Sequence, residues 1–175
     1  MNYDRGDWHI DSLEDGAPEH YAWVHIGLFL RWAVVRGLEF GRFQAVDENG
    51  RDVTEQAHAA TLEAAEQVRT GSMTGSVFLE EHFDTKFFSG VLVGSADDFA
   101  RVYYLQTGKY LEDYSTAVPE DQTYKVDETD EIFTALKPII DHRYEAFEAA
   151  GGKAPGGFME KLRLAFGGSP RWTFG

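Results

Sequence analysis

Cysteine is absent from the 175 residues. Without a thiol, the chain has no disulfide framework, no thiolate metal ligand and no cysteine nucleophile. This absence fits a reducing compartment, and we expect the protein to be cytoplasmic. Long apolar runs are also missing, because the longest stretch, 21–35, is interrupted by His25 and Arg31. A membrane-spanning helix needs about 20 apolar residues. The first ten residues have no apolar core, so we expect no signal peptide.

Basic residues are scarce, with 16 Lys and Arg against 30 Asp and Glu, which gives a formal charge of −14. The imbalance lies in residues 1–135, which hold 10 bases against 26 acids, whereas the last forty residues hold six against four. A chain this acidic repels nucleic acid and anionic lipid and attracts cationic surfaces. We therefore expect a basic protein as the partner, and neither nucleic acid nor a membrane.

Familiar catalytic motifs are missing as well. The sequence has no Walker-type phosphate loop, no Gly-x-Ser-x-Gly elbow and no His-Glu-x-x-His pair. Adjacent acids such as Glu80-Glu81 and Asp97-Asp98 arise by chance in so acidic a chain, so they do not indicate a glycosidase. The sequence therefore predicts a protein that is not an enzyme and that needs no cofactor.

The composition favours one folded domain over residues 1–175, because 43% of the residues are hydrophobic and 14% are aromatic. Apolar periodicity predicts a mainly α fold, a bundle of five to seven helices, with minor β structure near 87–94 and 123–126. Residues 153–175 are rich in Gly and Pro. We expect them to form a C-terminal extension that ends in an aromatic tail, Trp172 and Phe174.

The stretch 19–36 is predicted to be the central helix. Pro18 suits the first turn of a helix, and Gly37 suits the position just after its end. Almost every residue between them is apolar. A helix that is apolar on all sides is buried, so we expect this one at the middle of the bundle.

Capping residues place the other helices. Thr74 is expected to begin a short helix after one that ends at Gly71, and Ser95 is expected to cap another with Asp98. Gly108 is expected to break or kink the helix that follows. A long helix begins at Asp127 or Thr129 and contains Pro138, which is expected to kink it or to start a new helix.

Glu80, Glu81, His82 and Asp84 lie in one short run. This run could hold a hard cation in a loop, or it could be a solvated acidic turn after a helix. We favour the turn, because one short run supplies too few ligands for a metal. The sequence therefore predicts no metal site.

His25 falls in the middle of the central helix, and a buried imidazole needs a partner for each ring nitrogen. Four carboxylates are candidates: Asp4, Asp7, Asp11 and Asp84. We favour a structural role in which His25 fastens the N-terminal segment to the helix. The alternative is a small ligand-binding domain or enzyme, in which His25, Asp84 and Lys86 converge in a pocket and His25 acts as a general base.

Trp8 and His9 stand out in a polar segment. An indole is costly to expose, so we expect Trp8 to dock on the core and pin the segment. In the alternative, the pair lines a recognition surface.

Residues 109–131 interleave acids with tyrosines, a pattern typical of a surface that steers a basic partner and then anchors it. The alternative is a solvated acidic face that only keeps the protein in solution. The predicted partner-binding residues are Trp8, His9, Tyr110, Glu112, Asp113, Tyr114, Glu120, Asp121 and Tyr124.

Several blocks of the sequence also resemble one family. The first block comprises Tyr3-Asp4, Trp8-His9, His25-Ile26-Gly27, Phe29-Leu30 and Trp32; later blocks include Thr74-Gly75, Tyr103-Tyr104, Tyr110 to Tyr114, Leu136-Lys137-Pro138 and Trp172-Thr173-Phe174. Together they are similar to a family of small bacterial proteins known as a domain of unknown function. The chain differs from the family pattern at Val24, where threonine is usual, and at His82-Phe83, where cysteine is frequent. Gly108 also interrupts its tyrosine-bearing helix.

The resemblance implies kinship of fold and lends no activity. By analogy, small acidic proteins of this kind look like immunity partners of secreted bacterial toxins. We therefore expect a cytoplasmic immunity protein, or antitoxin, that neutralises a basic toxin by charge-steered docking.

Overall fold

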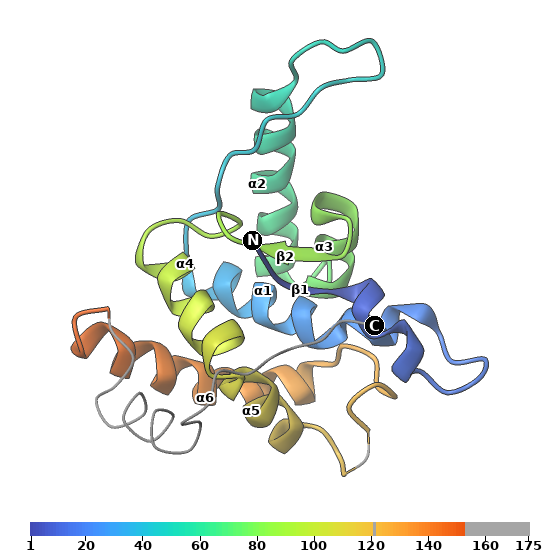
Figure 1. The fold of residues 1–175 in the computed structure, drawn as a ribbon, viewed down its shortest axis with the longest axis vertical. Coiled ribbons are helices and arrows are strands. Elements are labelled where there is room, and N and C mark those ends of the chain that lie inside the picture. Colours follow the sequence, from blue (N-terminus) through green and yellow to red (C-terminus); the bar gives the residue numbers. More distant parts are fainter. Residues whose placement is uncertain (121, 153–175) are drawn as a thin grey trace, which may run out of the picture.

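The structure, a computed structural model, describes residues 1–120 and 122–152. Asp121 and the predicted C-terminal extension, 153–175, lie outside the described residues. The described part is mainly helical, with six α-helices and one two-stranded sheet (Figure 1). It contains no helix with the length and apolar character needed to cross a bilayer.

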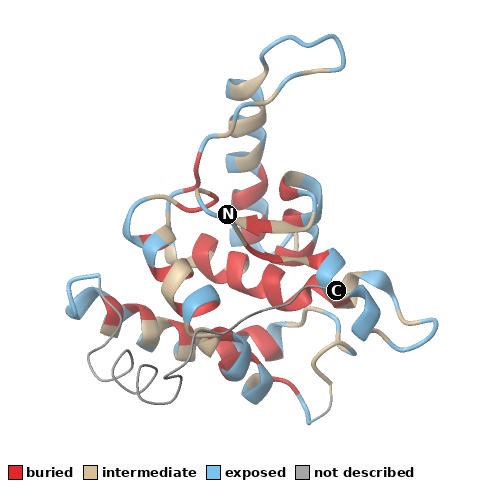
Figure 2. Ribbon diagram, viewed as in Figure 1, coloured by how far each residue is buried: buried red, intermediate tan, exposed pale blue. Residues whose placement is uncertain are grey.

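The central helix is α1 (Val24–Arg36), which follows a 3₁₀ helix at Glu19–Trp23. Ten of its 13 residues are buried, and Figure 2 shows it as the most continuously buried element. It ends at Gly37, which has φ 77° and whose N–H bonds to the carbonyls of Ala33 and Val34. The prediction of a buried central helix is confirmed.

Two helices follow in the expected places. α2 (Thr54–Thr70) ends at Gly71, and its first half projects from the body with the connection before it (Figure 1). α3 (Gly75–Phe83) begins as predicted, because the Thr74 hydroxyl accepts a hydrogen bond from the Val77 N–H. α3 lies directly on α1.

Two glycines allow α1 and α3 to touch backbone to backbone. A Cβ on Gly27 would lie 2.4 Å from the backbone nitrogen of Ser76, and a Cβ on Gly75 would lie 2.0 Å from the Gly27 carbonyl oxygen. No side chain fits in this space, so the crossing requires glycine at both positions.

The sheet pairs β1 (Asn2–Arg5) antiparallel with β2 (Lys86–Phe88). β2 overlaps the predicted β region 87–94. β1 was not predicted, because four residues with no apolar alternation give no strand signal. Residues 123–126 form no strand, contrary to the expectation. Beyond β2, the buried residue Leu92 forms an isolated antiparallel β-bridge with Phe40.

The next helical region changes type along its length. α4 (Ser95–Ala100) continues into a π-helix at Arg101–Gln106, and α5 (Lys109–Ala117) follows. Gly108, with φ 61°, separates the last two, which confirms the predicted break. The predicted Ser95 cap is wrong: Gly94, with φ 61°, takes the capping position, and no side chain caps the helix.

α6 (Asp130–Ala149) completes the fold along the lower face, against α5 (Figure 1). The Thr129 hydroxyl caps it by accepting from the Ile132 N–H, and the helix runs through Pro138 without ending. Its inner stripe consists of Ile132, Phe133, Leu136, Ile140, Tyr144 and Phe147. Tyr144 contacts Trp32 of α1 edge-on, so α6 shares one aromatic core with the central helix.

Candidate functional site

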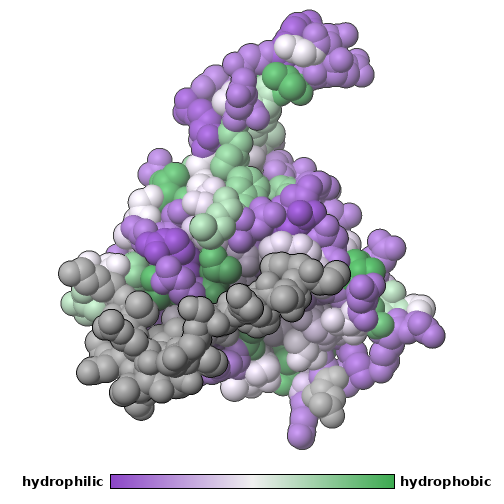
Figure 3. Space-filling view, in the orientation of Figure 1, coloured by the Kyte–Doolittle hydropathy of each residue, from purple (hydrophilic) through white to green (hydrophobic). Residues whose placement is uncertain are grey.

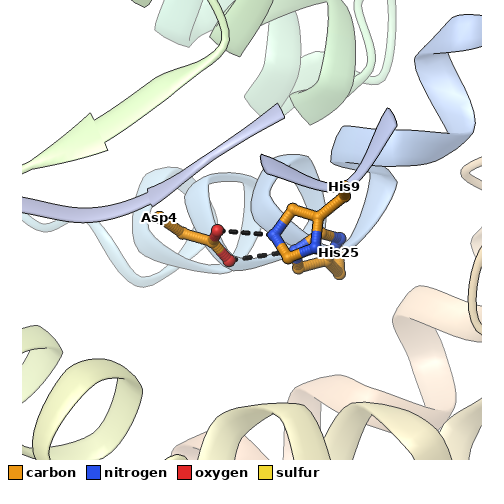
Figure 4. Close-up of side chains that lie close together, drawn as sticks. All are labelled: Asp4, His9 and His25. Atoms are coloured by element: carbon orange, nitrogen blue, oxygen red, sulfur yellow. Dashed lines mark hydrogen bonds and ion pairs between the residues drawn. The ribbon is translucent and has the colours of Figure 1, made fainter. Parts of the chain in front are cut away.

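A carboxylate and two imidazoles meet beside the central helix (Figure 4). Asp4 comes from β1, His25 from α1, and His9 from the turn between two short 3₁₀ helices, Gly6–Trp8 and Ile10–Ser12. The Nε2 atom of His9 lies 2.6 Å from Oδ1 of Asp4, and Nε2 of His25 lies 3.0 Å from Oδ2. One carboxylate therefore joins three segments of the chain.

An irregularity in β1 brings Asp4 into this position. The register of the sheet shifts between Asn2 and Asp4, and the neighbours Tyr3 and Asp4 are both buried. In a regular strand, successive side chains alternate between the faces, whereas a bulge re-aims one of them. The Asp4 carboxylate is held further by the N–H of Arg5, at 2.8 Å.

The cluster is enclosed, and its burial and hydrogen bonds shift the pKa values of Asp4 and His25. Exposed side-chain fractions are 0% for His25, 6% for Asp4 and 16% for His9. Burial alone would raise the pKa of Asp4, but hydrogen bonds from His25 and His9 outweigh it and hold that pKa below its ordinary value. Burial lowers the pKa of His25. The site therefore contains a charged carboxylate and, at His25, a neutral imidazole.

Tyrosines surround the cluster. The Tyr124 hydroxyl lies 2.8 Å from Nδ1 of His9, and the Tyr110 hydroxyl donates to the carbonyl oxygen of His25 at 2.5 Å. Of the four buried side-chain atoms without a hydrogen-bond partner among the described residues, two belong to this region: Nδ1 of His25 and the hydroxyl of Tyr104. Burial raises the pKa of Tyr104 well above its ordinary value, and the nearby Asp4 carboxylate raises it further.

Asp4, His9 and His25 line none of three hollows found on the surface of the described residues. Three hollows of about 510, 520 and 320 Å³ are lined by other residues. A general base must reach the proton it removes, and His25 is fully enclosed. The arrangement can clamp three segments of the chain together or hold an ion.

The alternative pocket of His25, Asp84 and Lys86 does not assemble. Asp84 and Lys86 pair with each other, and the Asp84 side chain is 85% exposed. The carboxylate bonded to His25 is Asp4, one of the four that the sequence suggested. Asp84 points elsewhere because it ends α3 in the left-handed conformation, with φ 51°.

Glu80, Glu81 and His82 lie in the last turns of α3 rather than in a loop after it, with Asp84 at its end, and they form no group of metal-ligand atoms among the described residues. The His82 Nδ1 atom lies 3.4 Å from the Thr61 hydroxyl, and burial lowers its pKa. Among the described residues, the group whose donor atoms are close enough to hold a metal is Asp4, His9 and His25. Sequence reasoning missed this trio because its members come from three separate segments.

Three of the predicted partner-binding residues are core residues. Tyr110 and Tyr114 are fully buried, and Asp113 is 6% exposed. Asp113 accepts hydrogen bonds from Tyr103 at 2.8 Å and from Arg143 at 2.8 and 3.1 Å. These residues share the inner face of α5, so they cannot anchor a partner, and that part of the prediction is wrong.

The remaining residues of the predicted set differ in their surroundings. Glu112 and Glu120 are exposed, and Glu112 pairs with Lys109. Tyr124 is half-buried against His9. Asp121 lies outside the described residues.

Trp8 does not dock on the core. It is 55% exposed, and Ile10 beside it is 36% exposed. The residue between them, His9, enters the interior instead and fastens the segment. The docking prediction for Trp8 is therefore wrong, and the exposed indole is available to a partner.

Two acidic segments lie side by side around this point. Lys125 pairs with Glu14 at 2.7 Å, and His20 bonds to Asp127 at 2.7 Å, so the segment 7–20 contacts the chain at 125–127. We call the following exposed residues the acidic surface: Trp8 and Ile10 with Asp7, Asp11, Glu14, Asp15, Glu19, Glu120, Asp127, Asp130 and Glu131. In Figure 3, hydrophilic residues surround small hydrophobic patches at the right edge, where residues 7–20 lie.

Comparison with known proteins identifies the family but no function. Neither the curated proteins nor the solved structures contain a significant match. A sequence model of a domain of unknown function, DUF7832, matches residues 2–126. This match covers more than half of the chain and includes Asp4, His9, His25 and the segments of the acidic surface up to Lys125. The chain belongs to this family of domains of unknown function.

Proposed function

We propose that the protein is a non-catalytic binding protein that captures a basic partner protein on the acidic surface. The observation that carries this proposal is the half-exposed indole of Trp8, set in a segment with five exposed carboxylates. Tryptophan is enriched at the energetic centres of protein interfaces. Carboxylates around it would steer a cationic surface toward it.

The segment that carries Trp8 is held to the rest of the protein by the neighbouring residue, His9. His9 bonds to Asp4 and Tyr124, and Tyr124 belongs to the neighbouring acidic segment. That second segment is itself held to α3, because the Glu128 carboxylate accepts from the N–H groups of Gly75 and Ser76 at 2.9 and 2.8 Å. A surface ordered in advance loses less conformational entropy on binding, which favours affinity.

The charge of the partner follows from the charge of the surface. Within residues 7–19 every charged side chain other than histidine is acidic, and the one lysine from the adjoining segment, Lys125, is paired with Glu14. An acidic partner would be repelled and a neutral one would gain no steering, whereas a basic one would be attracted. The biological role we propose is that of a cytoplasmic immunity protein that occludes a basic toxin domain.

Affinity capture tests this proposal. The immobilised protein is incubated with extracts and secreted material of the cells that make it, at low salt, and the captured proteins are identified. We expect a protein with a basic domain. The dissociation constant of the purified pair is then measured for the unchanged protein, for Trp8→Ala and for Leu62→Ala, a control that is also half-exposed but lies on α2.

Two results support the proposal: Trp8→Ala weakens binding by at least tenfold, and Leu62→Ala leaves it unchanged. Capture of no basic protein would contradict the proposal. Equal effects of the two substitutions would contradict the assignment of the surface.

A further inference from the structure

The donor atoms of Asp4, His9 and His25 converge as metal ligands do. One ligand atom from each lies within 4.8 Å of the other two. Both imidazoles present Nε2 to the same carboxylate. Two imidazoles and a carboxylate form a ligand set that suits zinc and the other divalent transition metals.

We propose that Asp4, His9 and His25 bind one divalent transition-metal ion of the zinc, cobalt or nickel class. The ion would replace the two protons that now lie between the imidazoles and the carboxylate. The Nε2 atoms of His9 and His25 and the oxygens of Asp4, which are joined by hydrogen bonds when the metal is absent, all become ligand atoms when it is bound. Each N···O pair must widen slightly, because ligands stand about 2.0–2.2 Å from zinc in a tetrahedral arrangement.

The ring nitrogens that face away from the carboxylate can accommodate this exchange. When Nε2 binds the metal, a neutral imidazole carries its proton on Nδ1. For His9 that proton points to the Tyr124 hydroxyl, 2.8 Å away, which can accept as well as donate. A metal-bound histidine usually donates its other N–H in this way. For His25, Nδ1 has no partner at present, so gaining the proton breaks no bond.

Tyr104 is a second observation that points to a ligand. Its hydroxyl is buried and makes no hydrogen bond of ordinary length, although the Asp4 carboxylate is near enough to act on it as an acceptor. It lies within electrostatic reach of the Asp4 carboxylate. A buried hydroxyl without a partner is uncommon, and here it adjoins the cluster with the most metal-binding potential in the described residues. It is placed to contact a fourth ligand, such as a water bound to the ion.

The ion would act as a structural clamp. Its ligands come from β1, from the turn after Gly6–Trp8 and from α1. Binding would therefore fix the N-terminal segment on the central helix and hold the residue next to Trp8. This inference does not depend on the proposed function, because the metal can be measured on the isolated chain.

Cobalt titration tests the site. The protein without a polyhistidine tag is treated with a chelator, dialysed and titrated with Co²⁺, with d–d absorption and the melting temperature as readouts. We expect one equivalent to bind with tetrahedral absorption and to raise the melting temperature, and Zn²⁺ to displace it.

Variants separate this site from adventitious binding at surface histidines. His9→Gln should abolish the absorption, and Tyr124→Phe should weaken binding by about 10- to 100-fold, as expected for loss of a supporting hydrogen bond. His142→Gln, at an exposed histidine, should change neither. Circular dichroism of His9→Gln establishes that the fold is kept, since His9 is at the edge of the cluster.

The proposal is overturned if the unchanged protein gives no tetrahedral absorption. It is also overturned if folded His9→Gln binds as well as the unchanged protein, or if the signal is lost with His142→Gln. If His9→Gln fails to fold, the Co²⁺ affinities of Tyr124→Phe and His142→Gln are compared instead. Equal affinities of these two variants would reject the site.

Discussion

Trp8 and His9 are adjacent in sequence, yet their side chains have opposite surroundings. The His9 side chain is 16% exposed and bonded at both ring nitrogens, whereas Trp8 is 55% exposed. Hydrophobicity alone predicts the reverse order of burial. The buried Asp4 carboxylate accounts for the observed order, because a buried charge requires hydrogen-bond donors. The imidazole of His9 can donate to Asp4 from one ring nitrogen and bond to Tyr124 through the other, whereas an indole has a single N–H.

Alanine substitutions distinguish surface aromatic residues from core aromatic residues. Trp8→Ala should change the free energy of unfolding by no more than about 0.5 kcal/mol, the usual range for a surface position. Tyr110→Ala should lower it by about 3–5 kcal/mol, because it empties a fully buried site. Urea denaturation measures both. A large loss for Trp8→Ala would show that the indole packs on the core after all.

Asp113 should make stability depend on pH. Burial alone would raise its pKa, but the hydrogen bonds from Arg143 and Tyr103 outweigh it and lower the pKa below the ordinary 3.8. A carboxyl whose pKa is lowered by folding stabilises the fold above its unfolded pKa, and this contribution is lost as the pH falls below 3.8.

Asp113→Asn should therefore cost about 1–3 kcal/mol at pH 7. The difference from the unchanged protein should shrink as the pH falls below 3.8, as measured by urea denaturation at each pH. A difference that stays constant over this range would rule out the stated origin of the effect.

At the scale of elements, the helices were predictable, whereas only one strand of the small sheet, β2, overlaps a predicted β region. Thr74 and Thr129 cap α3 and α6, and Gly37 and Gly71 end α1 and α2, because these residues supply a hydroxyl acceptor or a left-handed backbone locally. β1 depends on pairing with β2, about 80 residues away, and a single strand of four residues carries no signal of that pairing.

The inner face of α5 shows a second limit of sequence reasoning. Asp113 looks like a surface residue until Arg143 of α6 and Tyr103 are placed against it. The candidate site was only half predictable for the same reason. The sequence offered Asp4 as one partner of His25, but three-dimensional pairing was needed to choose it and to add His9.

The crossing of α1 and α3 gives the clearest prediction about an element. Gly27→Ala places a methyl group 2.4 Å from a backbone nitrogen of α3, which no side-chain rotation relieves. We expect a loss of at least about 1–3 kcal/mol, the usual cost of overpacking. Glu63→Ala, on the exposed face of α2, is the control and should stay within about 0.5 kcal/mol. Denaturation midpoints that agree for the two variants would mean that the helices do not touch here.

The whole molecule carries a charge of −14, and the acidic surface concentrates part of it around one exposed indole. The sign of this charge is the basis for expecting a basic partner, which stays a prediction. The location of the surface was not predictable, because Tyr110, Tyr114 and Asp113 of the predicted set are used inside the core. What the fold adds is the contact of the segment 7–20 with Lys125 and Asp127, which brings two acidic segments together.

A matched pair of charge variants isolates the role of this face. Asp11→Asn, Asp15→Asn and Glu19→Gln together remove three charges from the acidic surface. Glu48→Gln, Glu63→Gln and Glu66→Gln together remove three charges from α2 and the connection before it, and all six positions are exposed. Both variants have the same net charge, so a difference between them reports location rather than total charge.

The most direct test of the proposed function is the association rate constant of the captured partner, measured against salt concentration for the unchanged protein and both charge variants. Charge-steered association is fast at low salt and falls steeply as salt rises. We predict that the first variant associates at least tenfold more slowly at low salt and responds weakly to salt, while the second resembles the unchanged protein. Equal rates for the two variants, or a rate that salt does not change, would contradict the account.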